Sequence, residues 1–120
     1  MTQTGHNPTP AWFDISTPDG PRAHRFYQDM FGWPVHVLDG TYALVGGDGG
    51  PPVGGIGQAG PDSPYTGIVV YFRVDDVDAA LARAEQLGGT RTMDPVSVPG
   101  QGRMAVFGDL DGNPVGLLGP

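Results

Sequence analysis

The sequence predicts an α+β fold made of two βαβββ modules. One pattern, a short strand followed by a helix that begins at an aspartate and ends at a glycine, occurs twice in the chain, over 12–32 and 69–89. The two copies are offset by 57 positions, from Asp19 to Asp76. Each is followed by short apolar runs separated by turn residues, which are typical of strands. Self-similarity at a fixed offset indicates duplicated supersecondary units that bury their faces together.

The first module is expected over about 11–59, and it opens with a strand near 11–16. Asp19 then begins a helix, with Pro21 at an early position where its missing N–H matters little. Gly32 suits the left-handed residue that ends the helix. The apolar residues recur at helical spacing, which predicts one buried face and leaves His24 among the polar residues on the water side. That predicted apolar face consists of Ala23, Phe26, Tyr27, Met30 and Phe31.

Three strands complete the first module. They are expected near 34–38, 41–45 and 53–59, and Asp39-Gly40 is a hairpin signal between the first two. The glycine- and proline-rich segment 46–64 is compatible with a flexible linker, but its place between the two copies favours a hairpin and a crossover.

The second module is expected over about 67–118. A strand at 67–74 precedes a helix capped by Asp76 and ended by Gly88-Gly89. Strands follow near 91–94, 103–108 and 114–118, and a tight turn at Asp111-Gly112-Asn113 joins the last two. The expected apolar face of the helix consists of Val77, Ala80, Leu81, Ala84 and Leu87.

Composition narrows the class of protein. A chain of 120 residues suits one domain over 1–120, and the absence of cysteine excludes disulfides and thiolate chemistry. The net charge of −7 makes nucleic acid a poor partner. The same charge would attract a cationic small molecule, or it only keeps the protein soluble. With neither a signal-like start nor a membrane-length apolar run, we expect a cytoplasmic protein without a membrane partner.

Strand alternation predicts which side chains lie on the face of the sheet opposite the helices. Side chains at alternate positions of a strand face opposite sides of the sheet. Phe13 and Ile15 are therefore expected to pack under the helix while Trp12, Asp14 and Ser16 face away. In the strand at 67–74, the same argument predicts packing for Val70, Phe72 and Val74, and it turns Val69, Tyr71 and Arg73 to the other face.

Three motifs in order give the chain a resemblance to a known family. They are Asp19 followed by Phe26-Tyr27 and Phe31-Gly32-Trp33, the segment 72–77, and the closing segment 109–113. Together they resemble the vicinal oxygen chelate superfamily, which includes glyoxalase I, bleomycin-resistance proteins and extradiol dioxygenases. The resemblance spans about 11–118 and departs at Leu110, where the family usually has proline. It implies βαβββ modules forming a curved mixed sheet around a cleft. It also implies a homodimer, in which the modules pair either within one chain or across two.

The family's metal ligands are missing from the matching positions. In the enzymes of the family, His or Glu from the first and last strand of each module hold a divalent metal. Here those positions carry Trp12, Val69 and Gly116, and the stretch 54–59 offers only Gln58. A hard cation needs several convergent oxygen or imidazole ligands. The sequence therefore predicts neither a metal nor another cofactor, and metal-dependent glyoxalase or dioxygenase chemistry becomes a lesser alternative, in which Asp14, His36 or Gln58 would be completed by a partner chain.

The first functional hypothesis is a metal-independent protein that binds a small molecule. It would sequester an aromatic or cationic antibiotic or metabolite, as bleomycin-resistance proteins do. Aromatic rings would stack on the ligand, and Asp14 would pair either with a cationic group or with Arg73. His36 is the one histidine that could face the cleft. The expected ligand-binding residues are Trp12, Asp14, His36, Val69, Tyr71, Arg73 and Gly116.

The second hypothesis is a metal-independent lyase or isomerase. It would act on a carbonyl-containing or polyketide-like substrate, with Asp14 as general base and Arg73 or Tyr71 stabilising an enolate. Turnover distinguishes the two hypotheses, because sequestration returns its ligand unchanged.

Overall fold

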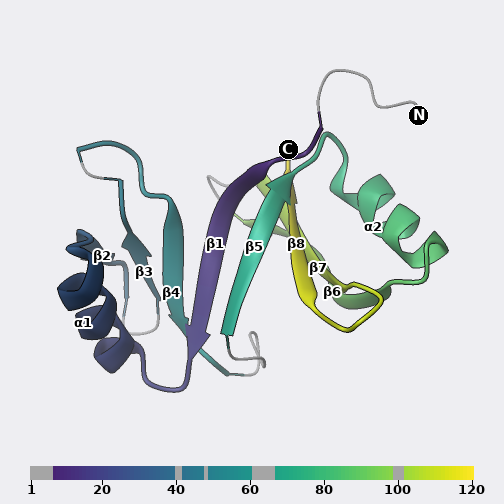
Figure 1. Cartoon of the computed structure of the whole chain (residues 1–120). Coiled ribbons are helices and arrows are strands. Elements are labelled where there is room, and N and C mark those ends of the chain that lie inside the picture. The colour runs from purple at the N-terminus through teal and green to yellow at the C-terminus, as the bar shows by residue number, and fades with distance from the viewer. Residues whose placement is uncertain (1–6, 40–41, 48, 61–66, 99–101) are drawn as a thin grey trace. The chain divides into compact units, whose positions relative to one another are not determined.

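The computed structural model describes residues 7–39, 42–47, 49–60, 67–98 and 102–120. Its elements follow the predicted order, strand then helix then three strands, twice along the chain (Figure 1). Among the described residues, no helix has the length and apolarity needed to cross a membrane. The elements are β1 (Pro10–Thr17), α1 (Gly20–Phe31), β2 (Val35–Val37), β3 (Tyr42–Val45), β4 (Gly54–Gln58), β5 (Gly67–Arg73), α2 (Val77–Gln86), β6 (Thr90–Val98), β7 (Gly102–Gly108) and β8 (Pro114–Gly119).

The chain divides into two compact units that share one topology. One unit is Trp12–Val69, and the other is Met1–Ala11 with Val70–Pro120. In the first, the strand order is β2-β3-β4-β1, with β1 and β4 parallel and the other pairs antiparallel. In the second, the order is β5-β8-β7-β6, again with one parallel pair, β5 with β8. The α+β class and its two βαβββ modules are therefore confirmed.

Both helices begin at the aspartates that the sequence singled out. The Asp19 carboxylate accepts a hydrogen bond from the Arg22 backbone N–H at 3.1 Å, and the Asp76 carboxylate accepts one from the Ala79 N–H at 3.0 Å. These bonds satisfy backbone donors that a helix start leaves without intrahelical partners. α1 ends at Gly32, whose φ of 68° is left-handed as expected.

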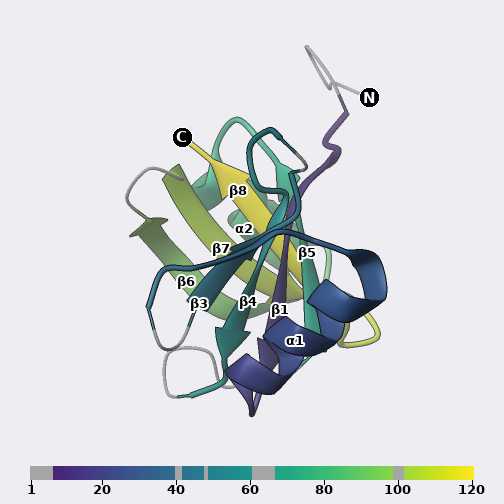
Figure 2. The ribbon, with the colours of Figure 1, turned by 90° about the vertical axis from the view of Figure 1, so that its left-hand side faces the viewer.

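α1 presents a different face to its sheet from the one predicted. Figure 2 shows α1 lying along the first module's strands. Ala23 and Tyr27 pack on the core of Ile15, Val45 and Ile56, as expected. Phe26 and Met30 are instead 60% and 64% exposed, Phe31 is 55% exposed, and His24 is buried at 9%. The prediction was wrong for these four residues because the helix carries apolar side chains around more than one face, so periodicity alone cannot fix its rotation.

Close contacts at the first turn of α1 account for that rotation. The Gly20 N–H donates to Gln58 Oε1 at 2.9 Å, and Gln58 Nε2 donates to the Pro18 carbonyl at 2.5 Å. Gly20 is buried as a result. With Gly20 held against the end of β4, His24, one turn further along α1, lies on the same buried side.

The second module has its core under α2. Val77 and Leu81 pack on Ala105 and Leu117, with Val74, Ala80 and Phe107 around them. The prediction was wrong for Leu87 and Val70, which are 61% and 37% exposed. Val69 and Tyr71, expected on the face opposite the helices, are buried at 0% and 2% exposure. Tyr71 lies on the expected face, because it pairs with Gly116 while the adjacent Phe72 pairs with Leu117 of the core under α2. Both faces of β5 are therefore covered in part, a situation in which alternation predicts the face of a residue and does not predict its exposure.

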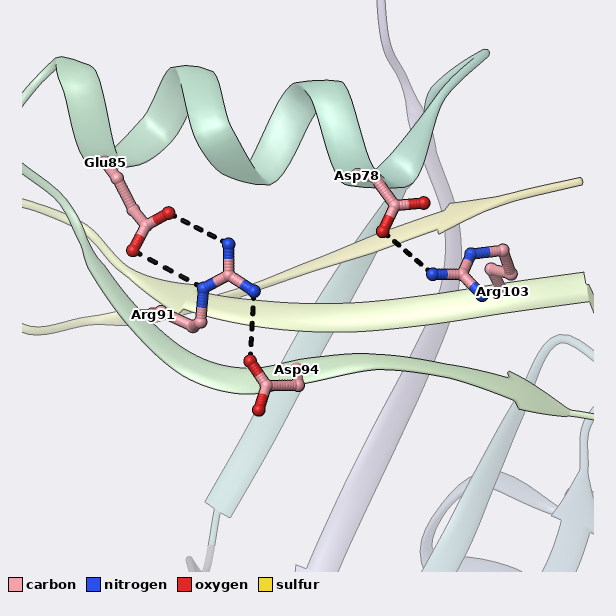
Figure 3. A network of polar contacts seen from close by, with 5 residues as sticks. All are labelled: Asp78, Glu85, Arg91, Asp94 and Arg103. Atoms are coloured by element: carbon pink, nitrogen blue, oxygen red, sulfur yellow. Dashed lines mark hydrogen bonds and ion pairs between the residues drawn. The ribbon is translucent and has the colours of Figure 1, made fainter.

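Ion pairs tie α2 to the strands beneath it (Figure 3). Arg91 pairs with Glu85 of α2 and with Asp94, both at 3.0 Å, and Arg103 pairs with Asp78 at 2.8 Å. The hydrogen bond from Arg91 lowers the pKa of Glu85 below its ordinary value and raises the pKa of Arg91. These charges belong to the exposed surface of the second module, so each pair contributes little to stability.

Candidate functional site

The face of the first module opposite α1 carries a row of residues across four strands. The strand register pairs His36 with Leu44, Leu44 with Gly55, and Gly55 with Asp14. Residues paired in register lie on the same face of a sheet. Phe13, Val45 and Ile56 belong to the core on the helix side. The intervening positions, which include Trp12, Asp14 and His36, therefore face the other way, as the sequence predicted.

Two donors converge on one oxygen of Asp14. Trp12 Nε1–H donates to Asp14 Oδ1 at 3.1 Å, and the Tyr42 hydroxyl donates to the same oxygen at 2.6 Å. All three side chains are partly buried. Hydrogen bonds to a charged acceptor are shorter and stronger than neutral ones, so the carboxylate is held in a fixed orientation. We refer to Trp12, Asp14 and Tyr42 as the Asp14 cluster.

The reach of Tyr42 depends on Gly55. A Cβ atom placed on Gly55 would lie 1.8 Å from the Tyr42 hydroxyl oxygen and 2.2 Å from the ring carbon that bears it. Gly55 lies between Tyr42's strand and Asp14's strand in the sheet. Because glycine leaves this position open, the Tyr42 side chain crosses over β4 to Asp14.

A shallow pocket lies further along the same face. It measures about 330 Å³ and is lined by Pro34, His36, Leu44, Pro52 and four glycines between positions 46 and 50. His36 is exposed there, on the edge strand β2. The structure thus places the predicted His36 on the face of the Asp14 cluster, but two strands, β3 and β4, lie between its strand and that of Asp14.

The equivalent position in the second module has different chemistry. Tyr71 pairs in register with Gly116, and a Cβ on Gly116 would lie 2.3 Å from the Tyr71 ring. Tyr71 is therefore packed over Gly116 as part of the interior, while Arg73 is exposed. Among the predicted site residues, the structure brings Trp12 together with Asp14 and Tyr71 together with Gly116. A joint site of all seven, and a pairing of Asp14 with Arg73, stay predictions.

Sequence reasoning missed Tyr42. The available signal was its place in an alternating strand, where Tyr42 and Leu44 share one face and Ala43 and Val45 the other. Nothing in the spacing revealed that Gly55, one glycine within a glycine-rich segment, would open the way for its hydroxyl. That contact joins positions 28 residues apart and arises only when β3, β4 and β1 lie side by side.

The positions of the family's metal ligands do not fit a metal in this chain. Gln58 uses both ends of its amide to hold the start of α1. The Trp12 indole N–H is a donor only, and Val69 and Gly116 offer no side-chain ligand atoms. Within the described ranges, no three His, Cys, Asp or Glu side chains are grouped closely enough to hold a metal ion.

The chain belongs to the glyoxalase/bleomycin resistance protein/dioxygenase superfamily, whose family model matches residues 9–117. The resemblance found in the sequence is thereby confirmed.

Among curated proteins, the chain is 37% identical to the anthracycline biosynthesis protein DnrV of Streptomyces peucetius, over 86% of the chain and 44% of DnrV. It thus spans less than half the length of that relative. It is also 29% identical to a glyoxylase-like domain-containing protein of Didymella fabae, over 83% of the chain and 84% of that protein.

Among solved structures, the chain is similar to homoprotocatechuate 2,3-dioxygenase from Brevibacterium fuscum, seen in an anaerobic complex with its substrate. The TM-score is 0.66 at 22% identity, over 92% of this chain and 35% of that one. At this identity the likeness establishes the shared fold.

Proposed function

We propose that this chain is a metal-independent binding protein for a planar aromatic small molecule of the anthracycline class, held at the Asp14 cluster. The observation that carries the proposal is the convergence of Trp12 Nε1 and the Tyr42 hydroxyl on Asp14 Oδ1. The cluster combines two flat aromatic side chains with one oriented carboxylate. Stacking surface with a few fixed polar groups is the usual composition of a small-molecule site.

The electrostatics favour a ligand that carries a positive group. The cluster contributes the carboxyl group of Asp14, and the formal net charge of the chain is −7. An indole face also attracts cations, so Trp12 would contribute both stacking and electrostatic attraction. A planar ring system with a cationic substituent therefore matches the cluster better than an anionic ligand does.

The relatives support the aromatic class. DnrV is named for anthracycline biosynthesis and is similar to this chain over residues that include most of both modules. Because the chain covers only 44% of DnrV, we take from that name the ligand class alone.

Tryptophan fluorescence tests this proposal with an internal control. The chain has two tryptophans: Trp12 in the Asp14 cluster, and Trp33, which packs against Phe13 and Phe31 on the helix side. Titration with a purified anthracycline should quench Trp12, so quenching should persist in Trp33→Phe and vanish in Trp12→Phe. Equal quenching of both variants would contradict binding at this cluster.

Removing the charge of Asp14 tests the polar part of the site. Asp14→Asn should weaken anthracycline binding by about tenfold, the range for losing a hydrogen bond to a charged group. Calorimetric titration of the purified protein measures this. Affinity that is unchanged in Asp14→Asn would remove Asp14 from the site.

The 2.6 Å hydrogen bond between Tyr42 and Asp14 favours a second function, a metal-independent lyase or isomerase. In that case Asp14 would accept a proton next to a substrate carbonyl, and the Tyr42 hydroxyl would hold the carboxylate in line. A polyketide-type substrate would be converted by the wild type and bound without conversion by Asp14→Asn. Recovery of every bound compound unchanged from the wild type would support sequestration instead.

A further inference from the structure

A second pocket lies on the helix side of the first module. It measures about 350 Å³, within the range of small-molecule sites, and is formed by the end of β1, the first two turns of α1 and the start of β5. All of its lining residues fall within the unit Trp12–Val69. Ile15, which lines it, belongs to the core on the α1 side. The pocket is thus separate from the Asp14 cluster on the opposite face.

The walls of this pocket are mainly apolar. Ile15, Ala23, Phe26, Tyr27 and Ile68 supply them. Phe26 and Ile68 are 60% and 56% exposed, although both are large hydrophobic side chains. An apolar ligand surface that covered these two side chains would remove their apolar area from water, which favours binding.

Among the described residues that line this pocket, one side chain is charged, and it is positive. Arg22 lines the pocket with its side chain 73% exposed, and its ion pair with Asp19 is long, at 3.8 Å. An exposed ion pair of this kind is weak and readily exchanged for a ligand anion. Arg91 and Arg103, by contrast, are engaged in pairs of 2.8 to 3.0 Å on the second module.

We propose that this pocket is a second ligand site, specific for a small planar apolar carboxylate. The ring system would lie against Phe26, Tyr27 and Ile68, and the carboxylate would pair with Arg22. The preferred charge is opposite to that expected at the Asp14 cluster, and the site does not depend on the function proposed for that cluster.

NMR titration of the full chain with 2-naphthoate tests the proposal. Backbone amide signals of Ala23, Phe26 and Ile68 should shift and saturate at millimolar or lower concentration, while the indole N–H signal of Trp12 stays in place. The neutral analogue 2-naphthalenemethanol has the same ring and lacks the charge, so it should bind about threefold to fivefold more weakly.

Two arginines of α1 provide a matched pair of variants. Arg22→Gln should lower the affinity for 2-naphthoate to that for 2-naphthalenemethanol. It should leave the affinity for 2-naphthalenemethanol unchanged. Arg25→Gln makes the same charge change on the same helix outside the pocket lining and should leave both affinities nearly unchanged. Ile68→Glu, at an exposed position, should weaken the binding of 2-naphthoate by about tenfold, because the new carboxylate repels the ligand and the apolar contact is lost.

Three results would overturn the proposal. They are shifts that do not saturate, saturable shifts confined to the Asp14 cluster, and equal effects of Arg22→Gln and Arg25→Gln. Failure of anthracycline binding at Trp12 would leave the result at this pocket unaffected, so the two proposals fail separately.

Discussion

The two modules carry different side chains at one equivalent position of their sheets. Asp14 and Tyr71 are equivalent by the internal offset, since 71 − 14 = 57, and each pairs in register with a glycine on a parallel neighbouring strand. In the second module Tyr71 covers its glycine and is buried. In the first, Tyr42 from another strand covers Gly55, and its hydroxyl meets Asp14. Duplication has kept the register, while one side chain decides between packing and a polar site.

To test this comparison, we expect the largest effect on stability when alanine replaces each of the two glycines. Gly116→Ala should lower the free energy of unfolding by about 2 to 3 kcal/mol, because the new Cβ meets the ring of buried Tyr71. Gly55→Ala should lower it by only about 1 kcal/mol, since the half-buried Tyr42 can swing away from the new Cβ. Urea denaturation measures both values.

Gly50→Ala is the matched control, because a Cβ at Gly50 would meet nothing within 4 Å. Its stability should differ from the wild type by less than about 0.5 kcal/mol. If Gly55→Ala destabilised the protein as much as Gly116→Ala, the first module would be as tightly filled as the second, and the comparison would be wrong.

The next effect is the coupling between Tyr42 and Asp14. A double-mutant cycle with Tyr42→Phe and Asp14→Asn should give an interaction energy of about 1 to 2 kcal/mol, as for a hydrogen bond to a charged group. Chemical denaturation of the four proteins provides the cycle. A coupling near zero would mean that the short contact does not position Asp14 in solution.

A smaller effect, equal in both modules, is expected at the helix caps. Asp19→Ala and Asp76→Ala each remove a side-chain acceptor for a first-turn N–H, and each should lower stability by about 1 kcal/mol. Thermal unfolding of the two variants compares them directly. A clear inequality would show that the duplicated helix starts are no longer equivalent in energy.

The smallest effect is the pH dependence of the exposed charges in the second module. Arg91 lowers the folded pKa of Glu85 below its unfolded value, so the contribution of Glu85 is present above the unfolded pKa and is lost as pH falls through the folded one. Glu85→Gln should therefore be slightly less stable than the wild type at neutral pH and equal to it in acid. A difference in the free energy of unfolding between wild type and Glu85→Gln that grows as the pH falls would contradict this prediction.

The contribution of Asp109 to stability should depend on pH in the same direction. Hydrogen bonds from the Asn113 side chain, the Asn113 backbone and the Asp111 backbone lower its pKa. Asp109→Asn should thus be less stable than the wild type at neutral pH and equal to it in acid, as expected for Glu85→Gln. Both groups lie in the second module.

Local rules predicted the elements well and the site only in part. Capping aspartates and turn glycines act within a few residues, so the helix starts at Asp19 and Asp76 could be predicted from the sequence. Alternation placed Trp12 and Asp14 on one face correctly. It also placed Tyr71 correctly on the face opposite α2, but it did not predict that Val69 and Tyr71 are buried, because a strand covered on both faces has no simple alternating pattern of exposure.

The sequence by itself determined the duplicated βαβββ plan, the helix ends and the absence of the family's ligand types at Trp12, Val69 and Gly116, because spacing and residue type are local properties. Only the tertiary structure decided how α1 is rotated and which donors hold Asp14. Those outcomes depend on contacts between distant segments, Gly20 of α1 with Gln58 of β4 and Tyr42 of β3 with Asp14 of β1. Such contacts form only when the segments come close together in the fold, so no pattern within one segment predicts them.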